Sequence, residues 1–454
     1  MAPALDGLSM ADRGLTRLAG VVANVSWTSF EQMLRIGLSF LVTVQVINAL
    51  GPERFGLYSY VISVVGILAP LTAFGLEQVV IRRLVERPAD SARLLGTTFV
   101  IRMVCGVVAF LAALVVILVL DGGNGLRLRL TAVAGVMLLL QATDTVAFFF
   151  KAIMGAKHIA LSRLAGLLSA SGVTVVLLVT GGGVGSFLWM RALEAGVTGI
   201  ALMLAYRWWG GKSTSWRFDG RECGRLLSAG FPLFIASFAV MVYMRVPQLM
   251  LGQLSTEEQL GYYGVAVRLA EVLNFVPVAI VTAFYPALVD CRARSPEAFR
   301  RKIQGLYNLM AAIGYVVAIG ATVVAPLGFR ILFGHRYDAA LPMFNRLVWG
   351  MLFVCLGVAM NAMLTVIGRN WISAAATVAG MVVNVGLNFW LIPRLGAVGA
   401  AWAALASYWV SAHGVFLLLP EFHGTFAMIA RALVWPDIRL LRPAAEDSRP
   451  PPSP

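Results

Sequence analysis

Apolar stretches recur from Leu18 to Leu419, separated by short polar joints, and this repetition most constrains how the chain can fold. Each stretch has about 20 residues, the length of helix that crosses the roughly 30 Å hydrocarbon core of a bilayer. Charged residues make up only 13% of the chain, whereas soluble domains carry about 25%. The sequence therefore predicts an all-α polytopic membrane protein and excludes a soluble enzyme.

The apolar stretches divide into about twelve transmembrane helices, an even number that places both termini on one side of the membrane. The predicted spans are 18–48, 56–78, 98–120, 130–150, 159–180, 184–206, 226–253, 262–289, 304–328, 343–367, 371–392 and 396–419. Residues 1–17 are too polar for a signal peptide, so we expect the first helix to stay in the mature protein.

The basic residues outside these spans collect in alternate loops, which indicates the orientation of the chain. One side holds basic groups at 13–17, 82–93, 151–163, 207–225, 292–302, 369 and 431–449. The opposite loops hold only Arg54, Arg127, Arg129, Arg330, Arg336 and Arg394. Because basic loops stay in the cytoplasm, the pattern predicts cytoplasmic termini and explains the net charge of +14 without nucleic acid.

The longest predicted cytoplasmic loop divides the chain into two sets of six spans. After the first span of each set, a Glu, a Gly and a Tyr keep the same spacing: Glu53, Gly56 and Tyr58, then Glu258, Gly261 and Tyr263. This match favours an internal repeat with a pathway between the halves, although glycine-rich turns also recur by chance. The predicted parts are an N-terminal six-helix bundle (1–210), a cytoplasmic linker (211–225), a C-terminal six-helix bundle (226–421), and an interfacial segment with a disordered cytoplasmic tail (422–454).

Charged residues inside the spans need a specific reason, since a charge at the bilayer centre costs roughly 3 kcal/mol even on a lenient scale. Three basic residues have an acid three or four positions away, on the same helix face. These pairs are Glu31 with Arg35, Arg191 with Glu194, and Arg268 with Glu271. Each pair has two possible roles. It is either a structural ion pair within one helix, which lets charged side chains lie in the protein interior, or part of a substrate site.

Arg245 differs from these residues because no acid lies within one helical turn of it. It needs an acidic partner from another helix or an anionic ligand, and a diphosphate matches the geometry of its guanidinium. Pro247, two residues later, predicts a kink that exposes backbone carbonyls to a cavity.

Other polar residues in the spans suggest ion coupling or helix packing. The candidates for coupling to an ion gradient are Glu31, Asp144 and Glu271. An interhelical hydrogen bond is the competing role for Asp144. Arg102 and Arg346, near span ends, are expected to extend toward water. Hydrogen bonds between helices are expected from Asn274, Asn384 and Asn388.

Sequence signatures of soluble catalysis are missing. There is no Walker loop, no HExxH and no G-x-S-x-G elbow. The four cysteines and four histidines are scattered without metal-ligand spacing. The sequence thus predicts a transporter and not an enzyme, without metal or cofactor, coupled at most to a proton or sodium gradient.

Segments along most of the chain carry a family resemblance. They are "LGPERFGLYSYV" (Leu50 to Val61), "FGLEQVVIRRL" (Phe74 to Leu84), "QLMLGQLSTEEQLGYYGVAVRLAE" (Gln248 to Glu271), "ILFGHRYDAA" (Ile331 to Ala340) and "NVGLNFWLIPRLGAVGAAWA" (Asn384 to Ala403). In order and spacing they resemble the Wzx-like polysaccharide flippases of the multidrug, oligosaccharidyl-lipid and polysaccharide exporter superfamily. That family often has an acid where this chain has Pro247, which counts against ion coupling there.

The resemblance implies two pseudo-symmetric six-helix bundles around a central cavity, in a bacterial inner (plasma) membrane. It implies alternating access that carries an undecaprenyl-diphosphate-linked oligosaccharide from the inner to the outer leaflet, for exopolysaccharide, capsule or O-antigen synthesis. Arg35, Arg245 and Arg268 would meet the diphosphate, with Glu31 and Glu271 holding them apart or exchanging protons. Membrane lipids, a polysaccharide polymerase and a chain-length regulator are the other expected partners.

Other functions remain open on the sequence. A drug or cation antiporter of the same superfamily is the first alternative, because acidic and basic residues within the spans are nearly balanced. A lipid II flippase is the second, although that branch usually has two further helices. A membrane glycosyltransferase or polymerase would normally carry a large catalytic loop, and a transport-inactive scaffold would leave the central charges unexplained.

Overall fold

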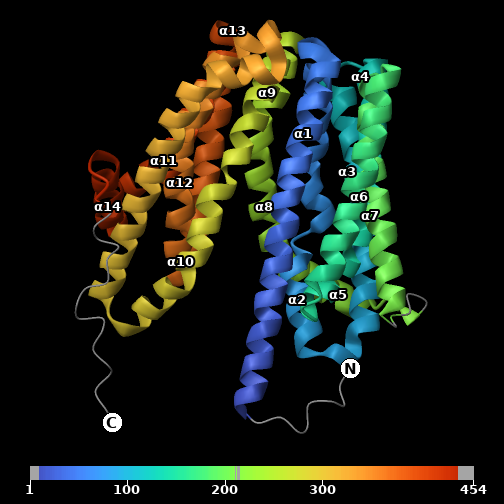
Figure 1. Ribbon diagram of the computed structural model, residues 1–454, viewed down its shortest axis with the longest axis vertical. Coiled ribbons are helices and arrows are strands. Elements are labelled where there is room, and N and C mark those ends of the chain that lie inside the picture. Colours follow the sequence, from blue (N-terminus) through green and yellow to red (C-terminus); the bar gives the residue numbers. More distant parts are fainter. Residues whose placement is uncertain (1–9, 210, 212–214, 438–454) are drawn as a thin grey trace. The chain divides into compact units, whose positions relative to one another are not determined.

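The computed structural model describes residues 10–209, 211 and 215–437, with side chains from residue 32 onward, and the predicted spans are helical apart from short turns. The helices are α1 (Met10–Ala73), α2 (Leu76–Glu86), α3 (Ser91–Leu120), α4 (Gly125–Leu140), α5 (Thr145–Ala152), α6 (Ala156–Thr180), α7 (Val184–Trp208), α8 (Gly220–Leu254), α9 (Glu257–Leu273), α10 (Phe275–Arg294), α11 (Pro296–Phe333), α12 (Leu341–Val366), α13 (Asn370–Ala412) and α14 (His423–Val434) (Figure 1). Short 3₁₀ turns join several of them, among them η2 (Gln141–Asp144), η4 (Gly334–Ala340) and η6 (Pro420–Phe422).

Nine helical stretches in the described part of the chain are long and apolar enough to cross a membrane. Some are longer than one crossing needs, because α1 and α13 continue through a glycine with positive φ, at Gly51 (72°) and Gly396 (57°). At each glycine the helix kinks where two separate spans were predicted. The all-α multi-pass class is confirmed, whereas the number of twelve spans is not.

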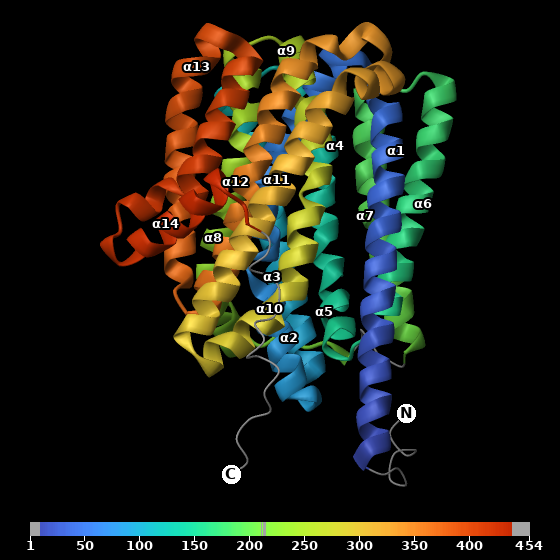
Figure 2. The ribbon, with the colours of Figure 1, turned by 60° about the vertical axis from the view of Figure 1, so that its left-hand side comes forward.

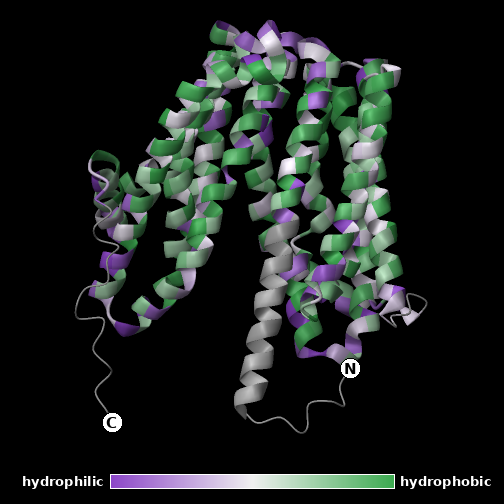
Figure 3. Ribbon diagram, in the orientation of Figure 1, coloured by the Kyte–Doolittle hydropathy of each residue, from purple (hydrophilic) through white to green (hydrophobic). Residues whose placement is uncertain are grey.

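Large apolar side chains cover the outside of these helices, as a lipid-facing surface requires. Val179 on α6 is 84% exposed, and Val323 and Leu327 on α11 are 73% and 63% exposed. Figure 3 shows hydrophobic residues along the long helices and hydrophilic residues mostly toward their ends. Such exposure would be unfavourable in water, so it supports insertion in a bilayer.

The chain divides into two compact units, residues 1–50 with 60–241, and residues 51–59 with 242–454. The division falls inside α8, after the predicted linker at 211–225, and α8 itself begins within that linker at Gly220. The linker packs on α3 of the first unit: Arg217 N–H donates to Ala92 O (3.3 Å) and Asp219 N–H to Thr97 Oγ1 (3.1 Å). The domain bounds given above and the central cavity stay predictions.

The core of the first unit forms where α2, α3, α5 and α7 meet. Leu76, Val80 and Leu84 recur every four residues on α2 and are at most 5% exposed, so they form one buried stripe. They pack with Phe150 of α5 and Tyr206 of α7.

In the second unit the core lies between α11 and α12, and α14 packs on the outside of α11 (Figure 2). Gln304 and Tyr315 of α11 donate to backbone carbonyls of α14, at Met428 (3.0 Å) and Leu433 (2.8 Å). The segment predicted to be interfacial is thus a helix docked on α11, while the tail at 438–454 lies outside the described residues.

The two sequence motifs proposed as a repeat lie against each other within the second unit. A Cβ placed on Gly56 would meet the backbone of Glu257, and one placed on Gly261 would meet the backbone of Pro52. The two contacts are reciprocal: Gly56 faces the backbone four residues before Gly261, and Gly261 faces the backbone four residues before Gly56. Only a residue without a side chain fits at either position.

The start of α8 is capped by Asp219, whose carboxylate accepts the N–H groups of Arg221 (2.8 Å) and Glu222 (3.0 Å). The hydrogen bond from Glu222, then that from Arg221 and the guanidinium of Arg93, hold the pKa of Asp219 below its ordinary value. A depressed pKa stabilises the fold above the unfolded-state pKa, about 3.9, and this contribution disappears as pH falls through the folded-state pKa.

We therefore expect Asp219→Asn to lower the thermal unfolding midpoint of the purified protein at pH 7, with the difference from wild type shrinking below about pH 4. Asp290→Asn is the matched control, because its ion pair with Arg294 is exposed. A pH-independent difference would show that Asp219 acts through its shape and not its charge.

Candidate functional site

Three charged residues inside the second unit form one cluster between α8 and α9. Glu271 Oε1 lies 3.1 Å from Nη1 of Arg245, and Glu271 Oε2 lies 3.4 Å from Nη1 of Arg268. The side chains are 22%, 15% and 28% exposed, respectively, so the cluster is largely withdrawn from the surface. Among the described residues, two guanidinium groups thus face one carboxylate.

The cluster answers the question that the sequence left open at Arg245. Its acidic partner comes from another helix, and it is the same Glu271 that was predicted to pair with Arg268. The contact with Arg245 lacks hydrogen-bond geometry, so Oε1 of Glu271 is buried without a hydrogen-bond partner. The arrangement thus keeps acceptor capacity on Glu271 and positive charge beside it.

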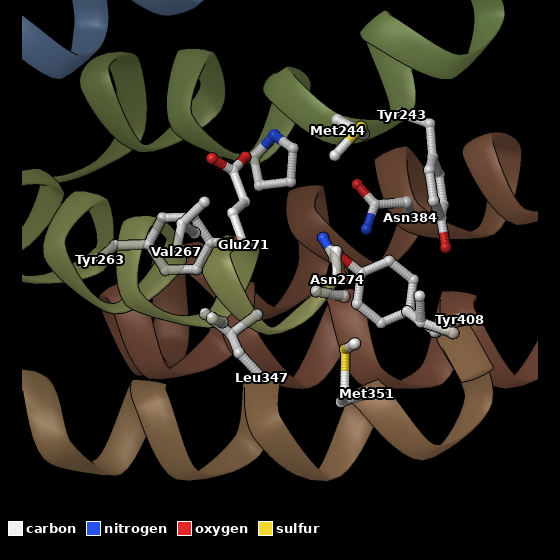
Figure 4. Close-up of a pocket in the computed structure, with 14 residues that line it drawn as sticks. Tyr243, Met244, Tyr263, Val267, Glu271, Asn274, Leu347, Met351, Asn384 and Tyr408 are labelled. Atoms are coloured by element: carbon white, nitrogen blue, oxygen red, sulfur yellow. The ribbon is translucent and has the colours of Figure 1, made fainter. Parts of the chain in front are cut away.

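A small cavity of about 40 Å³ adjoins this cluster. Glu271 of α9 and Asn274, the residue that follows α9, line one part of this cavity. Asn384 and Tyr408 line it from α13, as Figure 4 shows. Pro247 of α8 also lines it, and the helix continues through this proline. The volume is sufficient for water or a small ion.

Tyrosines complete the cavity, and none of them was predicted from the sequence as a site residue. Tyr243 and Tyr408 stack edge to face with ring centroids 5.6 Å apart, and Tyr263 is 2% exposed. Together with Met351 of α12 they make an aromatic and apolar wall beside Glu271. A usable signal was present, because a phenol in the middle of an apolar span needs a polar neighbour.

Asn384 joins the two halves of α13, as predicted for helix packing, whereas Asn388 hydrogen-bonds within its own half. Asn384 Nδ2 donates to Ser407 Oγ (2.8 Å), and Asn388 Nδ2 donates to Asn384 Oδ1 (2.9 Å). Asn384 and Asn388 are at most 1% exposed. The network holds the helix segments before and after the kink at Gly396 together, which fixes the wall that carries Tyr408.

In the first unit, Arg191 and Glu194 pair with each other on α7 at 2.9 Å, as their spacing predicted. Arg35 lies on α1 with an exposed side chain, and the side chain of Glu31 falls outside the described residues. Whether these four residues take part in substrate binding stays a prediction.

Arg102 corrects one expectation, because it is buried and does not extend toward water. It is 3% exposed, stands 5.1 Å over the ring of Phe148, and places Nη2 4.0 Å from Oδ2 of Asp144. Its Nε and Nη1 are buried without hydrogen-bond partners. The η2 turn between α4 and α5 brings Asp144 here. Asp144 is therefore the counter-ion of a buried arginine, a contact that sequence spacing could not reveal.

A family model described as polysaccharide biosynthesis protein matches residues 21–292, more than half of the chain. No curated protein sequence matches the chain significantly.

Three solved structures with the same fold are distant in sequence from this chain. The lipid II flippase MurJ in an inward closed conformation superposes with a TM-score of 0.66 at 11% identity, covering 90% of each chain. An inward-facing MATE family multidrug resistance transporter of the MOP superfamily gives 0.63 at 15% identity, covering 92% of this chain and 98% of that one. A MOP superfamily transporter from Pyrococcus furiosus, whose binding pocket is described as having reverse polarity, gives 0.55 at 15% identity, covering 92% and 95%. At these identities the likeness shows the fold alone.

Proposed function

Because this chain belongs to the polysaccharide biosynthesis protein family, we propose that it is a flippase for an undecaprenyl-diphosphate-linked oligosaccharide repeat unit. The fold is one used by membrane transporters, and no soluble catalytic signature accompanies it. Transport, and not catalysis, is therefore the proposed role. The polymer it serves would be an exopolysaccharide, a capsule or an O-antigen.

The observation that carries the proposal is the cluster of Arg245, Glu271 and Arg268. A lipid-linked sugar presents a diphosphate at the boundary between its apolar tail and its polar head, and guanidinium groups bind phosphate oxygens strongly. Glu271 now occupies the two arginines. An incoming diphosphate would compete with that carboxylate, so binding and release of the substrate would change how Glu271 is paired.

This competition suggests how transport could be coupled to an ion. When the diphosphate takes the arginines, Glu271 loses its counter-charges and would gain a proton or a sodium ion from the adjoining cavity. Asp144 and Glu31 are the other proposed coupling residues. Dissipating the proton gradient and the sodium gradient separately, during the transport assay below, tests this step. Unchanged transport in both cases would exclude coupling.

Two alternative functions compare with this proposal as follows. A drug or cation antiporter would favour a cavity with excess negative charge, whereas the described residues of the cluster are one acid and two arginines. A lipid II flippase would also bind a lipid diphosphate, so the charge of the cluster does not distinguish it from the proposed function. The two functions differ in the sugar-bearing lipid that is transported.

The test is complementation in a bacterium that lacks its own polysaccharide flippase, with surface polymer and accumulated lipid-linked repeat units as readouts. Matched strains, one depleted of its lipid II flippase and one sensitive to cationic drugs, receive the same gene. Restored polymer supports the proposal. Rescue of the lipid II strain, or drug resistance without polymer, would replace it with the corresponding alternative.

We further propose that the protein lies in a bacterial inner membrane with cytoplasmic termini, where a polymerase and a chain-length regulator would receive its product. Activity of reporter enzymes fused to the C-terminus checks the orientation, since alkaline phosphatase is active only outside the cytoplasm. An active phosphatase fusion would reverse the predicted topology. Failure of both proteins to co-purify with the flippase after crosslinking would count against the partners.

A further inference from the structure

A second, larger pocket lies in the C-terminal unit, where α10 ends and α11 begins. Its volume is about 780 Å³, and it is lined by residues of the α10–α11 and α12–α13 turns and of the segment from η6 to α14. The charged side chains that line it are Arg292, Arg300, Arg301, Arg369 and Glu421. Four arginines therefore face one acid.

In the described part of the chain, one of these four arginines has an acidic partner. Arg300 and Arg301 are exposed and form no ion pair within the described residues. Arg292 stacks over the ring of Phe299, at 5.6 Å. Arg369 meets Glu421 at 3.6 Å, between side chains that are 48% and 72% exposed, and such exposed pairs are weak.

Another arginine-rich pocket, of about 480 Å³ in the first unit, makes the contrast clear. There Arg83 pairs with Glu222, and Arg225 lies 3.6 Å from the same carboxylate. Arg82 lies 3.0 Å from Glu86. Three acids line that pocket with five arginines, whereas one acid lines the larger pocket with four arginines.

Most of the remaining wall of the larger pocket is apolar. It is built from Phe299, Ile303, Met363, Phe422 and Met428, and the first four of these belong to the buried core of the unit. A cavity lined both by guanidinium groups and by aliphatic and aromatic groups suits a ligand that is itself divided into an anionic head and an apolar tail.

The position of the pocket fits such a ligand. It lies at the junction of two candidate membrane spans, Glu257–Arg294 and Pro296–Val366, on the side that the basic loops predict to be cytoplasmic. Helix ends of this kind meet the level of lipid headgroups. Leu418, just before η6, is 81% exposed, which supports contact of this edge with acyl chains.

We propose that this pocket binds the phosphate headgroup of an anionic membrane phospholipid. The phosphate would bridge Arg300 and Arg301, with Arg292 and Arg369 at its sides, and the acyl chains would lie along the apolar wall. The site is separate from the cluster around Glu271 and does not depend on the proposed transport activity.

The test measures lipid binding to the purified full-length protein in detergent by native mass spectrometry, with phosphatidylglycerol and phosphatidylcholine of equal chain length. Wild type is expected to retain phosphatidylglycerol selectively. Arg300→Gln and Arg301→Gln should each weaken that binding about tenfold, because each removes a charge-assisted hydrogen bond. Arg330→Gln, at the opposite exposed end of α11, is the matched control and should leave binding within about twofold of wild type.

Competitors identify the source of the phosphate. Inorganic pyrophosphate that displaces nothing supports a lipid site, whereas pyrophosphate binding without phospholipid selectivity would overturn it in favour of a soluble anion. Equal retention of the two phospholipids by wild type would also overturn the proposal. So would a loss of phosphatidylglycerol binding in Arg330→Gln as large as that in Arg300→Gln and Arg301→Gln. A thermal melt of each variant separates these outcomes from misfolding.

Discussion

Arg245→Met is expected to reduce transport at least about tenfold, because a guanidinium–phosphate contact contributes at least one charge-assisted hydrogen bond. The protein should still reach the membrane, since Glu271 keeps Arg268 as a partner at 3.4 Å. Arg245→Lys keeps the charge but loses the planar fork, so it should retain part of the activity. The measurement is accumulation of lipid-linked repeat units at matched abundance in the complemented strain.

A double-mutant cycle with Glu271→Gln distinguishes anion binding from simple pairing. If Arg245 acts only by neutralising Glu271, the double variant should transport no worse than Glu271→Gln alone. If Arg245 binds the diphosphate, the double variant should lose about a further tenfold. Wild-type transport by Arg245→Met would remove the cluster from the mechanism altogether.

Gly56→Ala is expected to destabilise the protein by about 1–3 kcal/mol, the range for overpacking a close contact. The new Cβ would lie 2.8 Å from the carbonyl carbon of Glu257 and 3.0 Å from the backbone N of Gly261. These are backbone atoms, which cannot move aside as a flexible side chain can. Gly261→Ala should behave alike, because its Cβ would lie 2.7 Å from the carbonyl carbon of Pro52. The readout is the thermal unfolding midpoint in detergent.

Gly320→Ala is the control for these two variants. It lies inside α11 with nothing within 4 Å of an added Cβ, and alanine there should be neutral or stabilising by up to about 1 kcal/mol. Equal midpoints for Gly56→Ala and Gly320→Ala would show that the two motifs separate easily. Transport measured on the same variants shows whether this contact must open during the cycle.

The predicted intrahelical pairs illustrate how far sequence spacing reaches. Arg191 with Glu194 and Arg268 with Glu271 form as expected, because residues three apart on a helix share a face wherever the helix lies. Arg102 and Asp144 were each noticed separately, but 42 positions along the chain separate them, and only the packing of η2 against α3 brings them together.

Helix ends show a similar division. The polar joints near Gly51 and Gly396 were correctly taken as interruptions, because glycine tolerates the positive φ found there. The number of separate helices was not predictable, since a kinked backbone can keep its hydrogen bonding through the bend.

The sequence by itself determined the all-helical membrane class, the intrahelical ion pairs and the family resemblance, because hydrophobic length, helical periodicity and short motifs are local properties. Only the tertiary structure decided that Glu271 is shared by Arg245 and Arg268, that tyrosines from α8, α9 and α13 wall the adjoining cavity, and that four arginines gather at the α10–α11 turn. These contacts join residues far apart in the chain, and their cost or benefit depends on which helices pack together, which no local pattern encodes.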